Sequence, residues 1–182
     1  MRIISGTAKG RRLKEPGGNA IRPTTDMVKE SIFNIIQFDI EGRRVLDLFA
    51  GTGQLGIEAL SRGAAGVTFV DESNDAIKLV RENVKSLGFE DKATITRGDA
   101  TAFLRQGGGY DVIFLDPPYD SGLMEKALNS IIEFDMLKDN GIIICETNVE
   151  RQLPEVDLPY KKGKEYRYGK IKIALYGKNI HE

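Results

Sequence analysis

Strand-like and helix-like segments alternate from Val45 to Glu146, and this alternation restricts the possible folds more than any other feature of the chain. Apolar runs typical of buried strands occur near residues 45–49, 67–71, 94–97, 112–115 and 141–146. Apolar residues at helical spacing occur near residues 54–62, 73–87 and 123–134. Strands that alternate with helices form a parallel sheet with helices on both faces. The sequence therefore predicts a doubly wound α/β fold.

The C-terminal part of the chain breaks this alternation. Residues 165–168 and 171–176 are strand-like and are separated only by Gly169 and Lys170. Apolar residues alternate with other residues in the second of these segments, which is typical of a strand with one buried face. The short connection predicts an antiparallel hairpin that closes the parallel sheet.

The N-terminal part of the chain predicts a second small hairpin, followed by a helix. Residues 2–5 and 11–14 are strand-like and are joined by a glycine-containing connection. A helix follows the Gly- and Pro-rich loop at 16–23, and either Thr24 or Thr25 can cap it. A chain of 182 residues with 41% hydrophobic residues suits a single domain. We expect one domain over residues 1–182, with an N-terminal hairpin and helix extension at 1–40 and a core at 41–182.

Basic residues gather at both ends of the chain. Residues 1–22 contain six Lys or Arg against one Glu, and residues 160–178 contain seven against one, although the net charge of the whole chain is −1. Clustered cations of this kind contact the phosphates of nucleic acids, whereas a solvated surface is the alternative. We expect the two basic ends to form one surface that binds a polyanionic partner.

Cysteine content and hydropathy argue against a disulfide-stabilised, secreted or membrane-spanning protein. The single cysteine, Cys145, lies in an apolar run, so it predicts a small buried residue and no internal disulfide. No window approaches about 18 consecutive apolar residues, and residues 1–7 do not resemble a signal peptide. Cys and His show no ligand spacing, so we expect no metal site. The expected protein is cytoplasmic and does not enter a membrane.

A glycine-rich loop follows the first predicted parallel strand and opens a helix. Open α/β sheets bind ligands at such strand ends, and the pattern Gly51-x-Gly53-x-x-Gly56 lets the backbone approach a ligand closely. The next strand ends in Asp71, which is placed to accept hydrogen bonds from ribose hydroxyls. Taken alone, these features fit a nicotinamide dinucleotide site equally well.

Two further acids favour S-adenosylmethionine over a dinucleotide. Asp47 stands four residues before the first glycine, where its charge would repel a pyrophosphate but would suit the amino group of the methionyl moiety. Asp99 ends the third strand and could accept a hydrogen bond from the adenine amino group, although capping of a short helix at 100–104 is its alternative role. The sequence thus predicts a site for S-adenosylmethionine.

The string Asp116-Pro117-Pro118-Tyr119 ends the fourth strand and is the most specific motif in the chain. Consecutive prolines make a stiff turn that lacks two backbone donors and presents carbonyl acceptors. The Asp116 carboxylate and the Pro117 carbonyl could hold the amino group of a nucleobase and direct its lone pair toward a methyl donor. Tyr119 offers a flat face on which a base can stack. An ordinary rigid turn is the alternative interpretation.

These motifs resemble the Rossmann-like amino-methyltransferases of nucleic acids, and more narrowly the RsmD-type 16S rRNA (guanine-N(2)-)-methyltransferase family. The resemblance covers nearly the whole chain. The motifs that carry it are Arg2 to Gly6, Lys9 to Arg11, Arg22 to Asp26 with Glu30, Phe33 and Asn34, Asp47 to Gly53, Leu55 to Arg62 and Asp116 to Tyr119. One departure is Asp71, where many methyltransferases have Glu.

The resemblance implies a fold, an activity and a set of site residues. The fold would be a Rossmann-like, mostly parallel seven-stranded sheet, and the activity would be methylation of the 2-amino group of a guanine in 16S ribosomal RNA. The implied partner is ribosomal RNA, the 30S subunit or an assembly intermediate, with the protein as a monomer. The implied cofactor residues are Asp47, Phe49, Ala50, Gly51, Thr52, Gly53, Asp71, Asp99 and Ala100; the target base would lie at Asp116 to Tyr119, and Arg11, Arg12, Arg22, Thr24 and Thr25 would contact substrate.

Alternative functions remain open at the level of sequence. A nicotinamide-dependent oxidoreductase fits the glycine pattern. Hydride transfer usually needs an acid such as His, Tyr or Lys near the substrate carbonyl, but the single histidine, His181, is next to the last residue. A non-catalytic RNA-binding assembly factor fits the fold, but it does not account for the intact motif at 116–119. Amino-methyltransferases of DNA adenine or cytosine, or of a protein glutamine, would use a similar loop.

Overall fold

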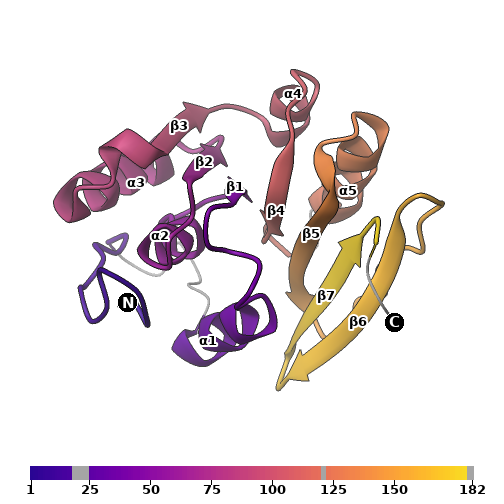
Figure 1. Cartoon of the computed structure of the whole chain (residues 1–182), viewed down its shortest axis with the longest axis horizontal. Coiled ribbons are helices and arrows are strands. Elements are labelled where there is room, and N and C mark those ends of the chain that lie inside the picture. The colour runs from indigo at the N-terminus through magenta and orange to yellow at the C-terminus, as the bar shows by residue number, and fades with distance from the viewer. Residues whose placement is uncertain (18–24, 120–121, 180–182) are drawn as a thin grey trace.

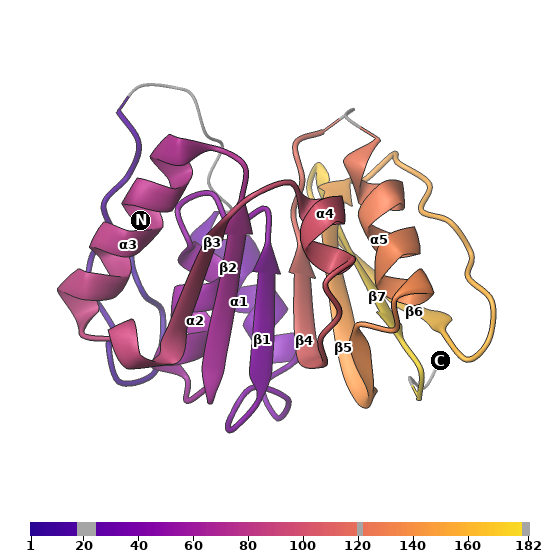
Figure 2. The ribbon, with the colours of Figure 1, turned by 90° about the horizontal axis from the view of Figure 1, so that it is seen from above.

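Seven strands form one mixed sheet in the order β3-β2-β1-β4-β5-β7-β6 (Figures 1 and 2). The computed structural model describes residues 1–17, 25–119 and 122–179, and the elements named here lie in that part. The strands are β1 (Arg44–Leu48), β2 (Gly66–Asp71), β3 (Ala93–Arg97), β4 (Tyr110–Leu115), β5 (Leu137–Asn148), β6 (Lys161–Tyr168) and β7 (Ile171–Gly177). The helices are α1 (Asp26–Ile35), α2 (Gln54–Ser61), α3 (Asn74–Leu87), α4 (Ala100–Leu104), α5 (Leu123–Glu133) and the short 3-10 helix η1 (Glu90–Lys92).

The pairing of the strands confirms the predicted fold class. β1 to β5 run parallel to one another, and β7 pairs antiparallel with both β5 and β6. The chain runs from β1 outward to β3 and then returns to the other side of β1 with β4. This reversal of strand order creates a crevice at the carboxyl ends of β1 and β4, which is where doubly wound sheets bind ligands.

Two hydrophobic cores lie on the two faces of the sheet. One contains apolar side chains of α1, α2 and α3, and the other contains those of α4 and α5. Cys145 is fully buried in the second core, as the sequence predicted, and burial raises the pKa of its thiol. Figure 1 shows α1, α2 and α3 on one side of the sheet, with α4 and α5 on the other.

Local signals set the helix boundaries. The Thr25 hydroxyl caps α1 by accepting a hydrogen bond from the Val28 N–H, and Ser73 caps α3 in the same way through Ala76. Gly88 ends α3 with a φ of 72°, a conformation that glycine adopts without strain. Among the described residues, no helix has both the length and the apolar character needed to span a membrane.

The N-terminal segment pairs less extensively than the sequence predicted. Residues 2–5 and 11–14 form only one isolated antiparallel bridge, between Arg2 and Arg12, in place of two regular strands. Three backbone hydrogen bonds still join the two segments: the Ile3 N–H donates to the Arg11 carbonyl at 2.9 Å, the Gly10 N–H to the Ile3 carbonyl at 2.8 Å, and the Leu13 N–H to the Met1 carbonyl at 3.2 Å. The division of the chain into residues 1–40 and 41–182 stays a prediction.

The buried carboxylate of Glu58 on α2 holds the N-terminal segment against the core. It accepts hydrogen bonds from the backbone N–H groups of Ile4 and Ser5, each at 2.9 Å. The Arg62 guanidinium donates to the same carboxylate at 2.9 Å, and the buried Lys29 ammonium lies 3.9 Å from it. Side-chain contacts with α2 therefore add to the short antiparallel pairing of the N-terminal segment.

Candidate active site

A cleft of about 820 Å³ opens at the carboxyl ends of β1 and β4. Its walls come from the glycine loop after β1, the ends of β2, β3 and β5, and the loop after β4. All the predicted cofactor and target-base residues except Gly53 line it, twelve in total: Asp47, Phe49, Ala50, Gly51, Thr52, Asp71, Asp99, Ala100, Asp116, Pro117, Pro118 and Tyr119. Residues from distant parts of the chain therefore meet in one cavity.

The three glycines of the loop have two structural roles. Gly51 and Gly53 have φ values of 55° and 78°, so both adopt the left-handed conformation that turns the chain from β1 into α2. Gly56 allows α2 to pack closely on the sheet, because a Cβ atom there would lie 2.3 Å from the Phe69 ring. Gly56 therefore supports packing rather than the approach of a ligand.

Asp47 lies beneath the loop with only 2% of its surface exposed. Its Oδ2 accepts a hydrogen bond from the Gly56 N–H at 2.9 Å. Burial raises the pKa of Asp47 to about 7, and the hydrogen bond from Gly56 only partly opposes this effect. A cationic group bound beside Asp47 would favour its ionised form and lower that pKa.

This raised pKa predicts that a cationic cofactor releases a proton when it binds. At about pH 6 the free protein carries Asp47 largely protonated, so a bound cation must displace the proton, and affinity should rise as the pH approaches about 7. Calorimetric titration with S-adenosylmethionine in buffers of different ionisation enthalpy measures this release. Asp47→Asn should abolish it. Identical heats in all buffers at about pH 6 would show that Asp47 releases no proton when the ligand binds.

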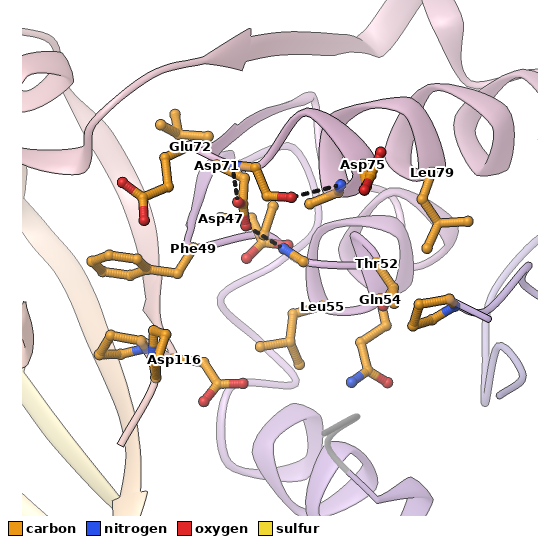
Figure 3. Close-up of a pocket in the computed structure, with 18 of the residues that line it drawn as sticks. Asp47, Phe49, Thr52, Gln54, Leu55, Asp71, Glu72, Asp75, Leu79 and Asp116 are labelled. Carbon is orange, nitrogen blue, oxygen red and sulfur yellow. Dashed lines mark hydrogen bonds between the residues drawn. The ribbon is translucent and has the colours of Figure 1, made fainter. Parts of the chain in front are cut away.

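Asp71 at the end of β2 holds the loop as well as facing the cavity. Its Oδ2 accepts from the Gly51 N–H at 2.9 Å, and its Oδ1 accepts from the Ser73 N–H at 2.8 Å. The next residue, Glu72, also lines the cavity, and Figure 3 shows both acids at the same end of it. Sequence reasoning missed Glu72, although its position beside the strand end was a usable signal.

Asp99 combines the two roles that the sequence left as alternatives. Its Oδ1 accepts from the Ala102 N–H at 2.8 Å and so caps α4. Asp99 and the neighbouring Ala100 also line the cavity. Because a carboxylate has two oxygens with several lone pairs, the cap leaves Asp99 able to accept further hydrogen bonds.

The motif Asp116 to Tyr119 forms the wall of the cavity that faces the start of α2. Asp116 follows β4 directly, and Figure 3 shows its carboxylate on the same side of the cavity as Gln54 and Leu55. Glu146 at the end of β5 lines the cavity too and has only 6% of its surface exposed. The rule that strand ends carry ligand-binding residues would have found Glu146.

The proposed substrate residues lie outside the cavity or outside the described part of the chain. Arg22 and Thr24 fall in the range 18–24, which the structure does not describe. The Arg11 guanidinium donates to the Ser86 carbonyl at the C-terminal part of α3, at 2.7 Å, and Arg12 is exposed on the same segment. Thr25 caps α1. Arg11, Arg12 and Thr25, which the structure describes, do not line the cavity.

The expectation that both basic ends form one surface is wrong for the residues that the structure describes. The N-terminal segment packs beside α3, which covers β3 and β2, whereas β6 is the opposite edge of the sheet (Figures 1 and 2). Acids also neutralise much of the C-terminal charge: Lys162 and Lys172 pair with Glu165, and Lys178 pairs with Asp135. The order of the basic residues along the chain did not reveal that the two ends lie at opposite edges of the sheet or that acids pair with the C-terminal lysines.

Within the described residues, no group of His, Cys, Asp and Glu is arranged to hold a metal ion. Of the cavity acids, Asp47, Asp71 and Asp99 accept hydrogen bonds from backbone N–H groups. A doubly wound sheet with an acid-lined glycine loop at its reversal point and Asp-Pro-Pro-Tyr on the next strand defines the class of Rossmann-like methyltransferases.

Comparison with known proteins places the chain within this class. Residues 1–177 match the family described as Conserved hypothetical protein 95, and the chain belongs to this family, the RsmD family. The resemblance inferred from the motifs is thereby confirmed.

Individual relatives are similar over almost their full length. The putative rRNA methyltransferase YlbH of Bacillus subtilis is 44% identical, with 98% of this chain and 99% of the relative covered. Ribosomal RNA small subunit methyltransferase D of Escherichia coli K12 is 36% identical, with 97% and 89% covered. The solved structure of the putative methyltransferase yhhF from Escherichia coli has a TM-score of 0.87 and 34% identity, with 98% and 97% covered.

Proposed function

We propose that this chain transfers a methyl group from S-adenosylmethionine to the 2-amino group of a guanine in 16S ribosomal RNA. The observation that carries the proposal is that one cavity contains both the acid-lined glycine loop and the Asp116 to Tyr119 motif. A methyl donor held by the loop would therefore lie beside an amino group held by the motif. The names of the relatives, which are methyltransferases of ribosomal RNA, support the same activity.

The acids of the cavity suit a cationic cofactor with a ribose. We assign cofactor contacts to Asp47, Phe49, Ala50, Gly51, Thr52, Gly53, Asp71, Asp99 and Ala100, and we add Glu72. S-adenosylmethionine carries a sulfonium and an ammonium, which negative charge attracts, whereas the pyrophosphate of NAD would be repelled. This difference in charge favours the methyltransferase over the nicotinamide oxidoreductase.

The reaction requires positioning more than acid–base chemistry. The lone pair of the guanine amino nitrogen is delocalised into the ring, so acceptors must hold its N–H groups and direct the lone pair at the methyl carbon. The Asp116 carboxylate and the Pro117 carbonyl are the proposed acceptors. The N–C bond forms as the S–C bond breaks, S-adenosylhomocysteine leaves as a neutral thioether, and the nitrogen then loses one proton. Stacking on Tyr119 would contribute about 1–3 kcal/mol.

The substrate is proposed to be ribosomal RNA, either in the 30S subunit or in an assembly intermediate, and the protein to act as a cytoplasmic monomer. Arg11 and Arg12 lie outside the cavity, so any contact they make would be with RNA beyond the target base. The same role is proposed for Arg22, Thr24 and Thr25. Such contacts are electrostatic and weaken as salt is added.

Titration calorimetry with S-adenosylmethionine, S-adenosylhomocysteine and NAD tests the cofactor assignment. We expect the first two ligands to bind and NAD to give no heat of binding, because of the acids around the loop. Asp99→Ala should weaken binding of the adenosyl ligands while α4 loses only its cap. Tight NAD binding without binding of S-adenosylmethionine would end the methyltransferase interpretation.

A further inference from the structure

The amide of Gln54 is a buried polar group that the glycine-loop motif does not explain. Gln54 is the first residue of α2, lines the cavity and has 6% of its surface exposed. Its Oε1 is buried and has no hydrogen-bond partner. Buried acceptors without donors cost folding free energy and are rare, so their presence beside a cavity points to a ligand that supplies the donor.

The position of Gln54 indicates which part of the reaction complex it meets. In Figure 3 its amide lies at the same side of the cavity as the Asp116 carboxylate, with Leu55 between them, while Asp71 and Glu72 lie at the other side. Asp71 and Glu72 are the proposed ribose contacts. Gln54 therefore faces the region proposed for the methyl acceptor rather than the region of the cofactor ribose.

We propose that Gln54 is a specificity-determining residue that reads the guanine edge next to the reacting amino group; this inference rests on the proposed function. A primary amide offers one acceptor and one donor side by side. Figure 3 shows Nε2 rather than Oε1 on the side of Asp116, so the proposal requires the amide to turn about χ3 when the base binds. Oε1 then accepts from the guanine N1–H, Nε2 donates to O6, and Asp116 accepts from the 2-amino group. Adenine lacks the 2-amino group that Asp116 would hold, so it offers no methyl acceptor at that position.

The test compares two RNA substrates that carry either guanine or 2-aminopurine at the methylated position. Both bases have a 2-amino group, but 2-aminopurine lacks the N1–H and O6. Wild-type protein should show a kcat/KM higher for guanine by about 10- to 100-fold, the usual discrimination from a bidentate contact. Gln54→Leu should bring the ratio close to one, mainly by lowering kcat/KM for guanine. Affinity for S-adenosylmethionine should not change.

Thermal unfolding separates this role from a structural one. Gln54→Leu removes a buried unsatisfied acceptor, so its melting temperature should equal or exceed that of the wild type. Gln54→Glu keeps an acceptor for N1–H but places an oxygen opposite O6, so it should also lower kcat/KM for guanine more than for 2-aminopurine. Gln106→Leu, at an exposed glutamine outside the cavity, is the matched control and should leave the ratio unchanged.

Three outcomes would overturn the inference. If both Gln54 variants kept the wild-type ratio of kcat/KM for guanine to kcat/KM for 2-aminopurine, the amide would not read the base. Weaker binding of S-adenosylmethionine with an unchanged ratio would assign Gln54 to the cofactor, and a lower melting temperature with an unchanged ratio would assign it to the fold. Failure of the wild-type protein to methylate guanine in any ribosomal RNA substrate is a separate result and overturns the proposed function itself.

Discussion

Replacing Asp116 with alanine should lower kcat for methyl transfer by about 100- to 1000-fold, the usual loss when one preorganised electrostatic contact is removed from a reaction site. Asp116 follows β4 and lines the cavity beside Leu55 and Gln54. Because its proposed partner is the amino group of the base, affinity for S-adenosylmethionine should stay close to the wild-type value. Single-turnover transfer of labelled methyl to RNA measures the rate, and calorimetry measures the affinity.

The conservative variant shows what Asp116 contributes. Asp116→Asn should retain part of the activity, since an amide oxygen still accepts a hydrogen bond. Asp91→Ala changes an exposed carboxylate outside the cavity and should leave the rate unchanged, which controls for the loss of one negative charge. If Asp116→Asn were as inactive as Asp116→Ala, negative charge itself would be required, and acceptance of the proton by Asp116 would have to enter the mechanism.

Replacing Glu58 with alanine should reduce the free energy of unfolding by about 3–5 kcal/mol, as is typical when one partner of a buried ion pair is removed. Glu58 is fully buried and accepts from the backbone N–H groups of Ile4 and Ser5. Burial lowers the pKa of Lys29 while Glu58 opposes that effect, so the variant would leave a buried ammonium without its counter-charge. Denaturation in urea, followed by circular dichroism, measures the loss.

Glu82→Ala provides the matched control for Glu58. Glu82 also holds the N-terminal segment, through an ion pair with Lys14 at 2.9 Å, but both side chains of that pair are exposed. Exposed pairs contribute about 0–1 kcal/mol, so this variant should unfold almost like the wild type. Equal stability of the Glu58→Ala and Glu82→Ala variants would show that the buried carboxylate does not hold the N-terminal segment.

Much of the fold could be predicted because its signals are local. The apolar periodicity placed β1 to β4 and the helices within two residues of their bounds at most positions. It failed for the start of β5, since Lys138 to Asn140 are polar and extend the strand beyond the buried sheet. It failed for the start of β6, where an edge strand with alternating exposed residues and a register shift lacks a clear apolar pattern. The N-terminal segment is held on α2 by hydrogen bonds to Glu58, which is distant in sequence, so local patterns cannot reveal this contact.

The candidate site was predictable to the extent that its residues end strands. Asp47, Asp71, Asp99 and Asp116 follow from that rule, and all four line the cavity. Gln54 could not be predicted, because its importance comes from burial and from the lack of a partner, which sequence does not contain. The basic residues could not be placed either, because charge segregation along the chain does not fix positions on the surface.

Transfer of labelled methyl from S-adenosylmethionine tests the central claim most directly, with 30S particles, free 16S ribosomal RNA and duplex DNA as parallel substrates. Digestion of the product to nucleosides, followed by mass spectrometry, identifies the modified base. The proposed function predicts label in N2-methylguanosine from ribosomal RNA or 30S particles, with none in DNA, and loss of that label in Asp116→Ala. Label in methyladenine or methylcytosine of DNA, or no transfer to any of the three substrates, would contradict it.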